Sequence, residues 1–107
     1  MLSSLHMKSV FLYLCSGTFA GNQELDYNHP SEEANYKFLL FLYQAEQVPS
    51  ELKAKAEAAK FGFASCSIEN AKPLSIESIN TDTYQKFSSY YEEAIAEGSA
   101  LAWYPNH

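Results

Sequence analysis

The sequence predicts a single α/β domain in which a short, mainly parallel sheet is packed by helices, in the order βααβαβ. Two observations predict this class. Segments rich in β-branched and aromatic residues alternate along the chain with segments of helical periodicity. The chain has 107 residues, of which 47% are hydrophobic, so it can bury one core but is too short for two. Residues 1–107 are therefore treated as one domain.

The first half of the chain is expected to contain one strand and two helices. The apolar run from Ser9 to Cys15 predicts a strand buried on both faces, and Ser16 to Pro30 has the composition of a long loop. Ser31 to Gln47 begins with residues that favour a helix start and continues with apolar residues at helical spacing. A second, alanine-rich helix is predicted from Ser50 to Lys60, ended by Gly62.

The second half is expected to contain two strands and one long helix. Phe63 to Glu69 alternates in polarity and predicts a half-exposed strand, and Leu74 to Ile76 is a candidate edge strand. An amphipathic helix opens at Thr81 and ends at Gly98, before a last strand from Ser99 to Tyr104. The apolar stripe of that helix consists of Tyr84, Phe87, Tyr91, Ala94 and Ile95.

The N-terminal residues permit two interpretations. Residues 1–6 form a loose leader if Met7, which precedes Lys8, is the true start. The stretch from Lys8 to Ala20 also has the basic, apolar and small-residue order of a signal peptide. Its apolar core is short and interrupted, so a buried strand explains it as well. No apolar run approaches the roughly 18 residues of a membrane-spanning helix, which favours a cytoplasmic protein.

The charge of the chain favours some partners over others. Seven lysines and no arginine stand against thirteen acidic residues, giving a formal net charge of -6. Nucleic-acid binding and anionic membrane surfaces need clustered cations, so neither partner is expected. An acidic surface instead accelerates encounter with a basic protein.

No pattern in the sequence indicates catalysis, a metal or a cofactor. Cys15 and Cys66 both lie in apolar runs and are expected to be buried free thiols. A nucleophilic cysteine requires a histidine base, but His6, His29 and His107 are scattered and lack any metal-ligand spacing with the cysteines. We therefore expect no catalytic residues, no metal, no cofactor and no enzymatic activity.

Two further features are candidates for binding. The small-residue segment from Ser16 to Asn22 follows a buried strand, where α/β folds bind ligands, although it lacks the GxxxxGK[ST] pattern of a phosphate loop. Acidic residues in and beside the long loop, together with tyrosines and the single tryptophan, are predicted to form a docking surface for a protein partner. Its expected members are Glu24, Asp26, Tyr27, Glu32, Glu33, Tyr36, Trp103 and Tyr104.

The C-terminal third contains Ile76 to Asn80 and then a helix, a glycine and a strand from Tyr90 to Tyr104. In these segments the chain resembles the small acidic immunity proteins with which bacteria neutralise toxins of contact-dependent or secreted systems. The resemblance implies a cytosolic inhibitor that binds a cognate toxin domain, often a basic nuclease, through charge and shape.

Two alternatives to this function stay open. The first is a small ligand- or nucleotide-binding domain that uses the Ser16 to Asn22 segment. The second is a structural or interaction subunit that oligomerises through the apolar surface near Trp103 and Tyr104. The chain is accordingly expected to be a monomer or a homodimer.

Overall fold

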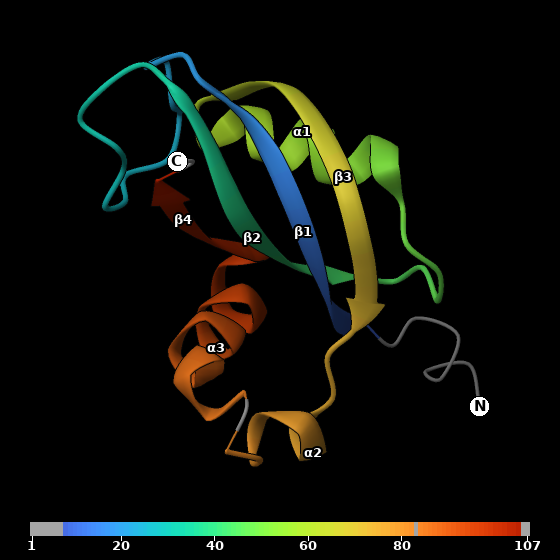
Figure 1. Cartoon of the computed structure of the whole chain (residues 1–107). Coiled ribbons are helices and arrows are strands. Elements are labelled where there is room, and N and C mark those ends of the chain that lie inside the picture. Colours follow the sequence, from blue (N-terminus) through green and yellow to red (C-terminus); the bar gives the residue numbers. More distant parts are fainter. Residues whose placement is uncertain (1–7, 83, 106–107) are drawn as a thin grey trace.

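The protein is built on a four-stranded antiparallel sheet. The computed structural model describes residues 8–82 and 84–105. The strands lie in the order β3-β1-β2-β4, and every neighbouring pair is antiparallel (Figure 1). This finding overturns the expected mainly parallel sheet and the order βααβαβ. The strands are β1 (Ser9–Phe19), β2 (Asn35–Gln44), β3 (Phe63–Pro73) and β4 (Ser99–Pro105).

The prediction of a helix from Ser31 to Gln47 is wrong, because most of this segment is strand β2. Its residues pair with β1 from Ser9↔Gln44 to Thr18↔Asn35. The apolar positions fit a helix, but both alternating sets of side chains are apolar, as in a strand covered on both faces. Tyrosine and phenylalanine are also common in this segment and favour strands over helices. With β2 antiparallel to β1, no helical crossover is needed between them.

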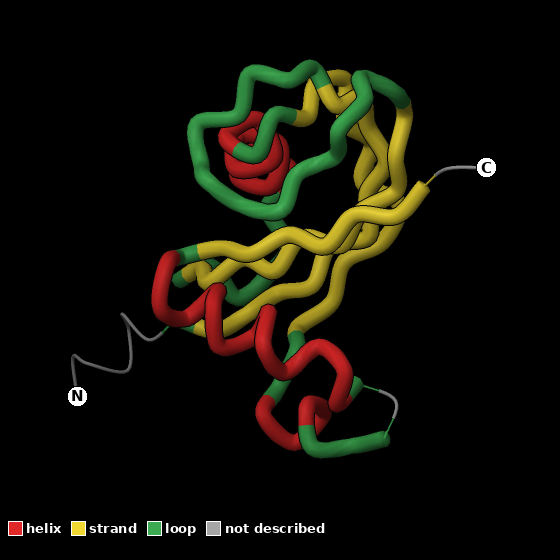
Figure 2. The backbone as a smooth tube through the Cα atoms, turned by 90° about the vertical axis from the view of Figure 1, so that its left-hand side faces the viewer, coloured by secondary structure: helices red, strands yellow, loops and turns green. Residues whose placement is uncertain are grey.

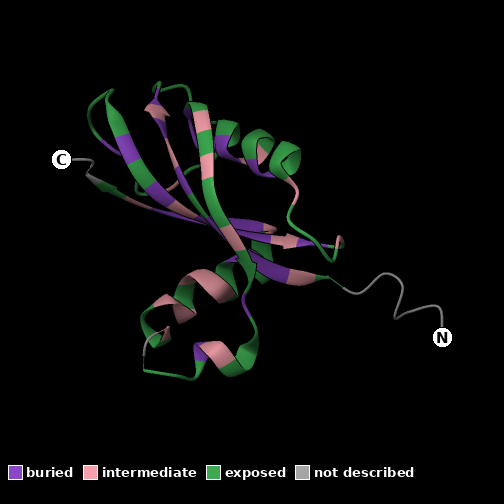
Figure 3. Ribbon diagram, turned by 45° about the vertical axis from the view of Figure 1, so that its right-hand side comes forward, coloured by how far each residue is buried: buried purple, intermediate pink, exposed green. Residues whose placement is uncertain are grey.

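Helices cover both faces of the sheet, as the side view in Figure 2 shows. Helix α1 (Glu51–Lys60) and the long loop 20–34 lie on one face. The other face carries the short helix α2 (Ile76–Ile79), the 3₁₀ turn η2 (Gln85–Phe87) and helix α3 (Ser88–Glu97). Burial is concentrated in the central strands, whereas much of β3 is exposed (Figure 3).

Two hydrophobic clusters correspond to the two faces. Side chains alternate across β1, so Phe11, Tyr13 and Cys15 enter the cluster under α1 while Val10 and Leu12 enter the cluster under α3. The larger cluster also contains Phe19, Tyr36, Phe38, Leu40, Leu42, Ala54, Ala58, Phe61, Phe63 and Leu101. The smaller one also contains Phe41, Leu74, Ile79, Ala94, Ala100 and Ala102.

The α1 region agrees closely with the sequence analysis. Ser50 caps the helix by accepting a hydrogen bond from the Lys53 amide, and Gly62 follows its C-terminus at φ +95°. A buried polar network holds the connection from β2 to this helix. The Tyr13 hydroxyl donates to Gln44 Oε1 at 2.5 Å and accepts from the Ser50 amide at 2.9 Å.

The C-terminal region differs from the expectation in its details. The predicted edge strand from Leu74 to Ile76 is wrong, since Leu74 is buried beside helix α2. Helix α3 begins at Ser88 rather than Thr81. Four residues of its expected apolar stripe, Tyr84, Phe87, Tyr91 and Ala94, pack in the smaller cluster, but Ile95 does not. Ile95 is 43% exposed, whereas Tyr90 stacks on Phe41. The end of this helix at Gly98 and the strand that follows are as predicted.

The segment Ser9–Phe19, which also has the residue order of a signal peptide, forms strand β1, as the buried-strand interpretation predicts. The expected leader of residues 1–6 and the start at Met7 lie outside the described residues. Within the described ranges, no helix has the length and apolar character needed to cross a membrane.

Gly62 should be a sensitive position for stability. A Cβ there would lie 2.7 Å from the Phe19 ring, and the positive φ is unfavourable for alanine. We expect Gly62→Ala to lower the free energy of unfolding by about 2–5 kcal/mol, from backbone strain and overpacking.

Gly98→Ala is the matched control, because Gly98 has φ +100° and no neighbour within 4 Å of an added Cβ. It should cost only the conformational strain, about 1–2 kcal/mol. Urea denaturation followed by circular dichroism measures both variants. Equal losses would contradict the close packing of Phe19 against Gly62.

Candidate functional site

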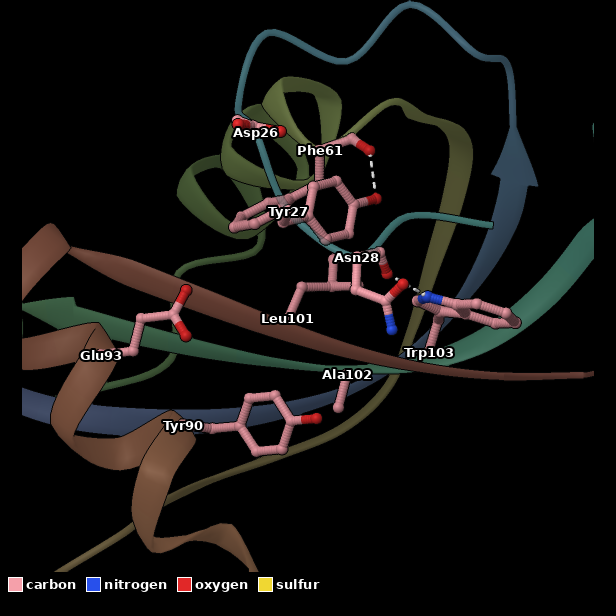
Figure 4. A pocket seen from close by; sticks show the side chains of 9 residues that line it. All are labelled: Asp26, Tyr27, Asn28, Phe61, Tyr90, Glu93, Leu101, Ala102 and Trp103. Atoms are coloured by element: carbon pink, nitrogen blue, oxygen red, sulfur yellow. Dashed lines mark hydrogen bonds between the residues drawn. The ribbon is translucent and has the colours of Figure 1, made fainter. Parts of the chain in front are cut away.

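A groove runs along the outer side of the edge strand β4. It consists of two adjoining cavities of about 440 Å³ and 510 Å³, which share Asp26, Tyr27, Phe61 and Glu93. Figure 4 shows Asp26, Tyr27 and Phe61 on one side of β4 and Glu93 of α3 on the other. We call this feature the β4 groove. Its remaining lining residues are Leu25, Asn28, Glu57, Lys60, Tyr90, Glu97, Ser99, Leu101, Ala102 and Trp103.

The first wall of the groove is held by hydrogen bonds from aromatic side chains. The Tyr27 hydroxyl donates to the Phe61 carbonyl oxygen at 2.5 Å, and the two rings meet edge to face at 4.9 Å. Trp103 Nε1 donates to the Asn28 carbonyl oxygen at 2.7 Å (Figure 4). Burial raises the pKa of the Tyr27 phenol, so the hydroxyl stays protonated and able to donate at neutral pH. These bonds fix the loop beside β4.

The second wall is helix α3. Its buried contacts are Ala94 and Tyr90, whose ring stacks on Phe41 at a centroid distance of 5.4 Å. This packing turns Glu93 and Glu97 toward the groove, four residues apart on the same helix face.

Carboxylates dominate the charge of the groove. Asp26, Glu57, Glu93 and Glu97 line one cavity together with a single lysine, Lys60. Glu57 is already engaged, because its carboxylate accepts from the Ser99 hydroxyl at 2.6 Å and pairs with Lys60 at 3.4 Å.

The other three carboxylates of the groove, Asp26, Glu93 and Glu97, make no ion pair with any described residue. Within the same part of the chain, no three potential ligand side chains converge where a metal ion could bind. The groove therefore offers negative charge that is spread over three carboxylates, which suits a partner with several separated cations.

Three of the sequence-predicted binding residues line the groove: Asp26, Tyr27 and Trp103. Tyr36 is buried beneath it, where its ring contacts Trp103 at 5.2 Å, and Tyr104 lies on the opposite face of the sheet because neighbouring strand residues alternate. The exposed carboxylates Glu24, Glu32 and Glu33 do not line the cavities.

Sequence reasoning missed the contribution of the two helices. Glu57, Glu93 and Glu97 are not among the binding residues that the sequence predicts. Their signal is weak in sequence, since exposed glutamates are ordinary on any helix. Tyr90 carried a better signal, because it fell outside the predicted apolar stripe and so had no core role in that arrangement.

The first part of the segment from Ser16 to Asn22 belongs to the sheet rather than to a loop. Strand β1 extends to Phe19, so Ser16 and Thr18 pair with both β2 and β3. The amides of Phe19 and Ala20 donate to the carbonyls of Ala34 and Gly62. The peptide groups of Phe19 and Ala20 are therefore bonded to neighbouring segments of the chain.

The two cysteines carry free thiols in different environments. Cys15 is buried in the larger cluster, and Cys66 is less deeply placed than the sequence suggested. The pKa of the Cys15 thiol is raised to about 12. Burial is the main cause, and the neighbouring Cys66 and Glu69 add to it. Burial also raises the pKa of Cys66. At neutral pH both are thiols rather than reactive thiolates.

Cys15 should therefore resist thiol reagents in the folded protein. At pH 8, well below its raised pKa, we expect Cys15 to react with Ellman's reagent at least about a hundredfold more slowly than an unfolded cysteine. The variant Cys66→Ser isolates Cys15, and Cys15→Ser isolates Cys66. Full reactivity should return in urea. Rapid labelling of Cys15 in folded Cys66→Ser would refute its burial.

Comparison with models of known protein families finds no match, and neither do comparisons with curated proteins and with solved structures.

Proposed function

We propose that this protein is a binding protein whose β4 groove receives a basic segment of a protein partner. In its specific form, the proposal is a cytoplasmic immunity protein that neutralises a cognate basic toxin domain by binding it. The observation that carries the proposal is the set of unpaired carboxylates, Asp26, Glu93 and Glu97, in a groove that also exposes aromatic rings.

Charge and shape both support this function. The formal net charge of -6 attracts a basic partner over long range. The groove carboxylates then provide the position at which the cations of that partner would bind. Tyr27 and Trp103 are already held by hydrogen bonds to the backbone, so they lose little conformational freedom when a partner packs on them. Rigid aromatic anchors beside carboxylates suit the aliphatic stems and charged ends of lysine and arginine.

The alternatives have less geometric support. A ligand site at Ser16 to Asn22 would need free amides, and the peptide groups at the start of this segment bond within the sheet. An oligomeric interface that joins Trp103 to Tyr104 would need both side chains on one surface, whereas alternation along β4 directs them to opposite faces.

Removing two groove charges should weaken the binding of a cationic probe. The probe is a capped peptide in which lysine alternates with threonine, and its affinity is read from the fluorescence of Trp103, the only tryptophan of the chain. We expect Glu93→Gln with Glu97→Gln to raise Kd between about twofold and thirtyfold, the effect of two exposed ion pairs. High salt should weaken the wild type in the same direction.

The matched control is Glu32→Gln with Glu33→Gln, which removes the same net charge from the loop outside the cavities. It should change Kd much less. If both double variants raised Kd equally, binding would depend on the net charge of the protein and not on the groove, and the proposal would be overturned.

Affinity capture from cell extracts, followed by an activity assay, tests the proposed immunity function directly. Wild-type protein and both double variants serve as baits in extracts of the source organism. A basic protein retained by the wild type and the loop variant, but not by the groove variant, is then purified. Its activity should fall when one equivalent of this chain is added. An unaffected activity would contradict neutralisation while leaving the binding function standing.

A further inference from the structure

Among residues 8–82 and 84–105, no strand pairs with the outer edge of β4. The Tyr43 amide donates to the Gly98 carbonyl oxygen, and the register pairs Phe41 with Ala100 and Leu39 with Ala102. Backbone groups alternate in direction along an antiparallel strand, so those of Ala100 and Ala102 face β2. The N–H and C=O groups of Ser99, Leu101 and Trp103 consequently face away from β2, into the groove.

No described residue forms a hydrogen bond with the outward backbone atoms of Ser99 and Leu101, and these two residues are only 4% and 6% exposed. A peptide group that is hidden from water and left without a partner costs about 1–3 kcal/mol. An added strand would supply the missing hydrogen bonds.

The opposite edge of the sheet is far less suited to pairing. Edge strand β3 has two irregularities in its register with β1, a residue of positive φ at Ser65, and the charged residues Glu69 and Lys72. Bulges and charges of this kind prevent the addition of another strand. β4 has no charged residue in its length. Of the two edges, β4 is the one left open, and it forms the floor of the acidic groove.

The spacing of the groove carboxylates matches an extended chain. Glu93 and Glu97 are one helical turn apart, a rise of about 6 Å. Alternate residues of a strand are about 6.6–6.8 Å apart and point to the same face. Two basic side chains at positions i and i+2 of an added strand would therefore reach one carboxylate each.

Resting on the proposed function, we propose that the partner segment binds by strand addition to β4, with lysine or arginine at alternate positions facing Glu93 and Glu97. The intervening side chains face Tyr27, Phe61 and Trp103 on the other wall, which suits apolar or aromatic residues. The recognised class is thus an extended, amphipathic basic segment of a protein. Main-chain hydrogen bonds give affinity, and the two walls of the groove give specificity.

Amide hydrogen exchange measured by NMR tests the mode of binding with the lysine–threonine peptide. At a peptide concentration about ten times Kd, exchange at Ser99, Leu101 and Trp103 should slow about tenfold, because the bound fraction controls opening. The amides of Ala100 and Ala102, which already face β2, should change little.

Two modified peptides make the test independent of the protein's side chains. One peptide carries backbone N-methyl groups on its odd-numbered residues, and the other carries them on its even-numbered residues. In an added strand only one set faces β4, so one peptide should lose binding at least about tenfold and the other should bind as before. Because charge is identical, simple electrostatic binding would affect both equally.

The outcomes separate the inference from the function on which it rests. Binding that depends on Glu93 and Glu97, without protection of the three outward amides and with equal behaviour of the methylated peptides, overturns strand addition and leaves a groove for basic segments. No binding of the unmodified peptide overturns both. Protection of the outward amides together with loss of only one methylated peptide establishes the added strand.

Discussion

The antiparallel pairing of β1 with β2 is the constraint on which the rest of the structure depends. Ten residue pairs, from Ser9↔Gln44 to Thr18↔Asn35, fix both strands along their whole length. Because side chains alternate, this one register decides which residues enter each hydrophobic cluster. A slip by one residue would exchange the two faces of β2 and separate Tyr13 from Gln44, whose hydrogen bond ties the start of α1 to the sheet.

The same pairing determines where a binding edge can exist. β1 and β2 occupy the centre, so β3 and β4 become the edges. β4 follows helix α3 after Gly98, whose left-handed conformation reverses the chain and keeps the helix beside the strand. The loop 20–34 comes from the other face and is fixed there by Tyr27 and Trp103. The groove thus lies between helix α3, which covers one face of the sheet, and the loop 20–34, which covers the other.

How much the sequence predicts differs between local and long-range features. The capping serine before α1 and the glycines after both long helices are local signals, and their positions are confirmed. β2 was misassigned because a strand covered on both faces is apolar on both, which hides its period of two. Composition predicted an acidic, aromatic surface with Asp26, Tyr27 and Trp103 in it. Glu93 and Glu97 join that surface only through the packing of Tyr90 on Phe41, a contact 49 residues apart in sequence that no local pattern encodes.

The groove carboxylates also explain how the chain tolerates an uncharged edge strand. An unpaired edge such as Ser99 to Trp103 invites pairing with a second copy of the same chain, and proteins usually prevent this with charges on the strand itself. Here the charges stand on the walls instead. Two copies paired through β4 would bring their Glu93 and Glu97 side chains close together, and like charges at short range oppose association. A basic segment meets the opposite situation. On the proposed function, the arrangement would discriminate by charge and leave the backbone edge available to a basic segment.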